Sequence, residues 1–212
     1  MRGEQKSSSR GVRPTNTPNR RSHEERRVEI ADAALRLIAT EGIASLTVAT
    51  LANELGLTGG ALYRHFPSSD AILDAVAERA VELLDASLPD PSLSPMVWLE
   101  QFVDSRTRAV SGHKGLASLI ISDQLAKALP ETAFEHLRGA VRRTFVQVER
   151  ALLSGQSQGQ IRQDLSAREL APVVMGIVQM IALSRSGSLL GRVTSSERTW
   201  HTLRTLLLAS TS

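Results

Sequence analysis

A short run of hydrogen-bonding and cationic side chains near residue 60 has the chemistry of a nucleic-acid contact. Tyr63, Arg64 and His65 are consecutive and supply a phenol, a guanidinium and an imidazole. A guanidinium can pair bidentately with guanine, so Arg64 is the best candidate for reading a base, with a salt bridge inside its own domain as an equal alternative. The other two suit phosphate oxygens, which position a protein on DNA. Gly59 and Gly60 would let the backbone approach DNA closely, or would merely loosen their helix.

Two short helical patterns joined at a glycine would present these side chains. Over residues 47–55 apolar residues recur at helical spacing, Thr47 can cap the start, and Gly56 supplies the left-handed residue that ends the helix. Thr58 is placed to cap the second helix, whose apolar residues point inward. This is the pattern of a helix-turn-helix, in which the second helix enters the major groove of DNA. Taken alone, the pattern fits a plain structural corner equally well.

The surroundings of this motif favour the helix-turn-helix. A longer helical pattern over residues 24–41 precedes it, and residues 67–70 open another helix after it. Over about the first third of the chain, this order resembles the tetracycline-repressor (TetR) family of transcriptional regulators. The residues that match the signature of that family are Ile30, Ala33, Ala34, Leu37, Gly42, Thr47, Val48, Leu51, Ala52, Gly56, Leu57, Ala61, Leu62, Tyr63, His65, Phe66, Asp70 and Leu73.

The resemblance implies a set of DNA contacts. The corresponding positions here are Thr58, Gly60, Tyr63 and His65, with Thr47 as a phosphate contact. Arg64 is added for its charge, and Gly59 because it would let the start of the helix approach DNA closely, as Gly60 would. Many members carry a lysine that reaches a phosphate where this chain has Ser69, so one charged contact is missing. The resemblance also implies a helical body that binds a small-molecule effector and forms a homodimer.

The formal charge of +3 is distributed unevenly along the 212 residues. Residues 1–27 carry eight lysines and arginines against three glutamates, a net +5, which leaves −2 for the rest of the chain. The stretch 1–22 is too polar to fold alone, so we expect a disordered basic arm that lies along the phosphates or in the minor groove. A solvated leader without DNA contacts is an equal alternative.

Composition disfavours several other classes of protein. The chain has no cysteine, which excludes disulfides and thiolate metal sites, and its five histidines show no ligand spacing. The charged N-terminus has no apolar segment behind it, and the longest apolar run, residues 170–183, is too short to span a bilayer. We therefore expect a cytoplasmic protein without membrane association, metal or cofactor. The motifs of helical-bundle metal enzymes, phosphate-binding loops and nucleophile elbows are all missing.

Proline and glycine divide the chain into about nine helices, and no strand-like alternation of useful length occurs, which predicts an all-α protein. The expected helices cover residues 24–41, 47–55, 58–65, 69–88, 93–110, 114–129, 131–154, 167–185 and 195–209. We expect an N-terminal three-helix helix-turn-helix head and a larger C-terminal helical bundle. The predicted units are the arm (1–22), the DNA-binding domain (23–68) and the ligand-binding and dimerisation domain (69–212).

The expected helix over residues 167–185 is apolar on every side. Such a helix has to bury one side against its own bundle and another against something else. With the final helix it could form a four-helix interface about a twofold axis, where the resembled family dimerises. A fully internal helix in a monomer is the alternative. The residues expected at the interface are Val174, Ile177, Val178, Ile181, Trp200, Leu203 and Leu207.

A charged residue interrupts the apolar face of the expected helix 93–110. Arg106 lies there at a position where a core residue is expected, and a buried guanidinium needs a partner. The partner could be an acidic ligand, or else an internal acid or solvent at the helix edge. The ligand pocket would then be lined by Trp98, Phe102, Arg106, Phe145 and Gln179.

These features together predict a sequence-specific, DNA-binding transcriptional regulator. By the resemblance, it is a repressor that binds a palindromic double-stranded operator as a homodimer and is released by a small-molecule effector in its C-terminal bundle. One alternative is an architectural protein that binds DNA without sequence preference, and a weaker one is a helical-bundle enzyme.

Overall fold

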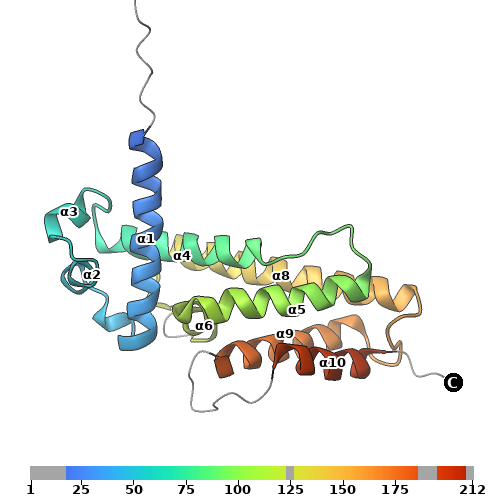
Figure 1. Ribbon diagram of the computed structural model, residues 1–212. Coiled ribbons are helices and arrows are strands. Elements are labelled where there is room, and N and C mark those ends of the chain that lie inside the picture. Colours follow the sequence, from blue (N-terminus) through green and yellow to red (C-terminus); the bar gives the residue numbers. More distant parts are fainter. Residues whose placement is uncertain (1–17, 123–126, 186–194, 209–212) are drawn as a thin grey trace, which may run out of the picture.

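The chain is built from helices, as Figure 1 shows, and the computed structural model describes residues 18–122, 127–185 and 195–208. The predicted all-α class is confirmed. The elements are α1 (Pro18–Glu41), the 3-10 turn η1 (Ile43–Ser45), α2 (Val48–Glu54), α3 (Gly59–Tyr63), α4 (Ser69–Ala86), α5 (Pro95–Gly112), α6 (Lys114–Ile121), α8 (Glu131–Ser157), α9 (Ala167–Arg185) and α10 (Ser196–Leu207). Among these described helices, none combines the length and apolar character needed to cross a membrane.

Helix boundaries differ most from expectation at two places. α1 begins at Pro18, so residues 18–22, expected in the disordered arm, are helical, while residues 1–17 of that arm lie outside the described residues. Proline suits the first position of a helix because its φ is already helical and its missing N–H would have no partner there. Of the helix expected over 114–129, α6 covers the part up to Ile121, where Ser122 turns to an extended conformation with ψ 109°, and residues 123–126 lie outside the described residues.

The helices form a small head at one end of an elongated bundle (Figure 1). α1 stands across the end of the bundle, with α2 and α3 on its outer side, and α4 leads from the head into the bundle. Within the bundle α4 packs against α8, α8 against α9, and α5 against α8, α9 and α10.

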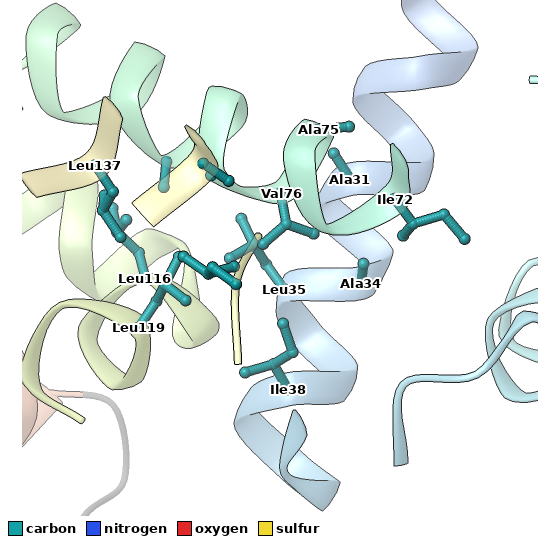
Figure 2. Packing of buried hydrophobic residues seen from close by; sticks show 14 of the residues in the cluster. Ala31, Ala34, Leu35, Ile38, Ile72, Ala75, Val76, Leu116, Leu119 and Leu137 are labelled. Atoms are coloured by element: carbon teal, nitrogen blue, oxygen red, sulfur yellow. The ribbon is translucent and has the colours of Figure 1, made fainter. Parts of the chain in front are cut away.

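One hydrophobic core joins the head to the bundle. It contains the inner faces of α1, α4, α6 and the first half of α8, which meet around Leu35, Val76, Leu116 and Leu137 (Figure 2). The anchors of the helix-turn-helix, Leu51, Leu62 and Phe66, belong to the same cluster. The predicted boundary between residues 68 and 69 therefore runs through a shared core, which gives the head a rigid attachment to α4.

A second hydrophobic core fills the far half of the bundle. It is formed by the start of α5, the end of α8, and α9 and α10, around Phe102, Leu152, Val174 and Leu203. Figure 1 shows the start of α5 and the end of α8 at the end of the bundle away from α2 and α3.

Candidate nucleic-acid interface

The first helix of the motif, α2, is fixed at both ends by residues close in sequence. The hydroxyl of Thr47 accepts a hydrogen bond from the N–H of Thr50 (3.1 Å), and the Thr50 hydroxyl accepts one from the N–H of Thr47 (2.9 Å). This reciprocal cap satisfies two N–H groups at the start of the helix. At the other end Gly56 has a φ of 63°, in the left-handed region that favours glycine. Thr47 caps the helix and is also exposed.

The second helix, α3, carries candidate contacts outward from a buried anchor. Thr58 caps it, because its hydroxyl accepts the N–H of the residue three positions on (3.2 Å). Leu62 is fully buried, whereas Tyr63 is 53% exposed and Arg64 is also exposed. Arg64 forms no ion pair with the described residues, so it is free to bind an external group. A Cβ added to Gly60 would meet nothing within 4 Å, which leaves the backbone uncovered there.

Two of the predicted contact residues face inward. Gly59 is half-buried, and a Cβ added to it would lie 3.8 Å from Cγ1 of Val48, so this glycine faces α2. The ring of His65 lies against the ring of His23 on α1, with 4.7 Å between their centres, and its Nδ1 is buried without a hydrogen-bond partner among the described residues. His65 therefore connects the end of the helix-turn-helix to α1 through its contact with His23.

Cations from α1 gather at this joint. Arg27 donates a hydrogen bond from Nη1 to the carbonyl oxygen of His65 (3.2 Å), and its guanidinium lies 4.6 Å from the centre of the Phe66 ring. Arg26 lies one residue earlier and pairs with Glu29 at 2.6 Å. Residues 28–66 carry two arginines against four acids, so these α1 cations supply positive charge that the motif lacks. A phosphate backbone would be attracted to such a cluster.

The sequence contained a signal for this cluster. Residues 23, 26 and 27 are spaced so that they share one face of a helix. This spacing was hard to recognise because basic residues occur throughout the stretch from residue 2 onward. In addition, the residues that these side chains contact, His65 and Phe66, lie about forty positions later in the chain.

The position of His65 predicts a pH dependence of stability. Burial, and then the charges of His23, Arg26, Arg64 and Arg27, hold the pKa of His65 below its ordinary value. The unfolded chain therefore takes up this proton at a higher pH than the folded chain does, and stability falls as the pH drops through about 6.5.

We expect the Tm to fall less for His65→Gln than for the unsubstituted protein between about pH 7.5 and about pH 5.5. The control is His201→Gln, an exposed histidine on α10. Equal falls for all three proteins would contradict the prediction.

Comparison with known proteins places this motif in a family. Residues 30–76 match the model of the bacterial regulatory proteins of the tetR family. The nucleoid occlusion factor SlmA of Marinobacter nauticus is 30% identical over 156 residues, which are 69% of this chain and 74% of that protein. The chain belongs to the TetR family.

Two further comparisons concern the regulation of transcription and the fold. ArpR of Pseudomonas putida, a probable HTH-type transcriptional regulator, is 33% identical over 101 residues, which cover 42% of this chain and 48% of ArpR. The structure of AibR in complex with isovaleryl coenzyme A and operator DNA has the same fold, with a TM-score of 0.69, 20% identity, and coverage of 86% of this chain and 98% of AibR. DNA binding through a helix-turn-helix and regulation of transcription are thus properties of the family to which this chain belongs.

In this TetR-family protein, the five residues expected at a ligand pocket lie near the second hydrophobic core. The rings of Trp98 and Phe102 stack with 5.3 Å between centres, and the guanidinium of Arg106 lies 5.3 Å from the centre of the Phe102 ring. Phe145 and Gln179 are half-buried. A cavity of about 820 Å³ lies elsewhere, between the start of α5 and α10, and none of the five residues lines it.

The predicted dimer interface needs a correction. Six of its seven residues are buried inside the chain's own core and cannot face a second chain, because the bundle itself covers that side of α9 and α10. These residues are Val174, Val178, Ile181, Trp200, Leu203 and Leu207. The seventh, Ile177, is half-buried. The opposite side of α9 is apolar and open instead: Pro172 and Gly176 are exposed, and Val173 and Met180 are each 50% exposed.

Proposed function

We propose that this protein is a homodimeric transcriptional repressor that binds a palindromic DNA operator and is released by a small-molecule effector. The observation that carries the proposal is that Tyr63 and Arg64 point outward at the end of α3, a capped helix anchored by the buried Leu62, beside cations of α1. Arg64 would read a base in the major groove, and Tyr63 and Arg26 would bind phosphates. Its place of action is the cytoplasm, where such an operator is found.

The dimer would form through the open side of α9. Pro172, Val173, Gly176, Ile177 and Met180 recur at three- and four-residue steps, so they form one stripe along the helix. A twofold axis through this stripe would pair it with its own copy, because the same patch is presented by both chains. Two α3 helices related by that axis can enter successive major grooves only at half-sites of matching spacing, which makes the operator a palindrome.

The effector would bind in the bundle, which we assign to residues 69–212, with residues 23–68 as the DNA-binding head. AibR supports this assignment, since its complex holds both isovaleryl coenzyme A and operator DNA on the same fold. The connector α4 is attached to both parts. Arg79 on α4 pairs with Asp32 on α1 (2.9 Å), and Asp85 on the last turn of α4 pairs with Arg143 on α8 (2.9 Å). A change in the bundle can therefore be passed to the head through α4.

Selection of bound sequences from a random duplex pool, at fixed salt, tests the proposed DNA recognition. We expect the purified protein to enrich a palindromic motif, and Tyr63→Ala and Arg64→Ala to weaken binding to that motif. For Arg64→Ala we also expect relaxed specificity at one position of each half-site, worth about 1–3 kcal/mol. The control is Arg108→Ala, an exposed arginine on α5. A pool without any enriched motif would favour an architectural protein, and a motif that both α3 variants retain would exclude α3 as its reader.

A further inference from the structure

The bundle holds a charged side chain in its interior. Arg106 on α5 is 4% exposed, and it is the only basic residue among the buried residues of the described chain. Its Nη2 donates to the carbonyl oxygen of Leu84 (2.9 Å) and to the hydroxyl of Thr144 (3.0 Å). The first acceptor is on α4 and the second on α8, so Arg106 joins three helices.

The charge of Arg106 has no carboxylate bonded to it in the described structure. The acid whose charge acts on it is Asp85, but the carboxylate of Asp85 bonds to Arg143. Nε of Arg106 is buried without a hydrogen-bond partner among the described residues, and so is the hydroxyl of the adjacent Thr107. Burial lowers the pKa of Arg106 to about 10, which still leaves the guanidinium protonated at neutral pH. A buried and unpaired cation destabilises a fold unless an anion compensates it.

We propose that Arg106 binds the carboxylate of the effector, and that the effector is a small monocarboxylic acid with an apolar remainder. This inference rests on the effector-dependent function proposed above. A single buried cation suits one negative charge, and the described residues bury no second basic side chain that could meet a polyphosphate group. The stacked rings of Phe102 and Trp98 beside Arg106 and the aliphatic residues of the second core suit an apolar chain.

The same contact links the acid to the DNA-binding head. Leu84 lies in the last turn of α4, and its carbonyl also accepts the hydroxyl (2.7 Å) and the N–H (3.3 Å) of Ser87. When a carboxylate binds Arg106, this carbonyl keeps its bonds to Ser87, and the hydroxyl of Thr144 still donates to the carbonyl oxygen of Ala140 (3.1 Å). Each of the two former acceptors of Arg106 therefore keeps a hydrogen-bond partner. The last turn of α4 then loses its bond to Arg106 on α5. Because α4 is paired to α1 through Arg79, its shift moves the head and weakens operator binding.

The test uses unbranched acids from butanoate to decanoate as probes, each beside its primary amide as an uncharged counterpart of similar size. The full-length protein, Arg106→Met, Arg106→Lys and the control Arg108→Met are compared by Tm and by operator affinity. Arg108 lies two positions later on α5, and its side chain is 69% exposed. Methionine replaces the buried charge with a chain of similar length, a change that proteins often tolerate without loss of stability.

At saturation, an acid of the series should raise the Tm of the unsubstituted protein and of Arg108→Met by several degrees and lower their operator affinity by roughly tenfold or more. Its amide should do neither. Arg106→Met should lose both responses, and Arg106→Lys should keep a reduced one.

Three outcomes would each overturn the proposal: equal effects of acid and amide, a response of Arg106→Met equal to that of the unsubstituted protein, or no Tm shift with any acid. If Arg106→Met does not fold, an undiminished response of Arg106→Lys overturns it. The Tm readout needs no DNA, so failure of the proposed operator binding is recognised separately, by the absence of an enriched motif.

Discussion

Gly176→Arg should abolish tight operator binding while leaving the protomer folded. Gly176 lies in the middle of the exposed stripe of α9, between Val173 and Met180, and a Cβ added to it would meet nothing within 4 Å of its own chain. An arginine there has room in a single chain. In the proposed dimer it would place a long charged side chain where two apolar stripes have to meet.

The expected loss of affinity follows from the two heads acting together. Once one head of a dimer is bound, the other head binds its half-site intramolecularly, which raises the affinity for the whole operator. A monomer lacks this effect, so operator affinity should fall by on the order of 100-fold or more. Analytical ultracentrifugation would report the oligomeric state, and titration with the selected operator the affinity. Gly112→Arg is the matched control, since Gly112 is also an exposed glycine with nothing within 4 Å of an added Cβ, but it lies at the end of α5. A dimer with unchanged operator affinity in Gly176→Arg would exclude the α9 stripe as the interface.

The helix-turn-helix could be located from the sequence because its signals are local. Thr47 and Thr58 each cap a helix within three residues, and Gly56 ends α2 in a conformation that few other residues adopt. Such features depend on spacing alone. The order of elements around them was equally readable, and the helices from α2 to α5 begin within two residues of the expected positions.

The face of α9 could not be predicted for a physical reason. This helix is apolar all round, so periodicity does not distinguish the side that packs in the bundle from the side that remains open. The structure buries Val174, Val178 and Ile181, and exposes Val173 and Met180. Pro172 and Gly176 lie on the exposed side, away from the core of the bundle.

Contacts between segments that lie far apart in the chain could not be predicted from the sequence either. The bond from Arg27 to the carbonyl of His65 joins residues 38 positions apart, and nothing in the spacing of either segment indicates it. The same holds for the acceptors of Arg106, which lie 22 and 38 residues away on α4 and α8. The pattern on α5 showed that this arginine lies on an apolar face, and only packing could show what its guanidinium contacts.

Gly115→Ala should be strongly destabilising, because α6 approaches α1 without room for a side chain at this position. A Cβ added to Gly115 would overlap the carbonyl oxygen of Leu35 and lie 2.6 Å from its carbonyl carbon and 2.9 Å from its Cα. These are backbone atoms in the middle of α1, so they cannot rotate away as a flexible side chain would. The clash lies in the core shown in Figure 2, where Leu35 meets Leu116 and Leu119 of α6.

The alanine can be accommodated only if α6 moves away from α1, and that opens the core that fixes the head on the bundle. We expect a loss of about 3 kcal/mol in the free energy of unfolding, at the upper end of the range for overpacking. In a protein of this size this corresponds to a fall of roughly 6–12 °C in Tm. Gly112→Ala is the control, because the added methyl group is unobstructed there and alanine favours a helix. Thermal denaturation of both variants measures the difference, and a Tm for Gly115→Ala equal to that of Gly112→Ala would contradict the close packing of α6 on α1. Since this packing sets the position of α1, and α1 carries Arg26 and Arg27, Gly115→Ala should also weaken operator binding at temperatures where the variant is still folded.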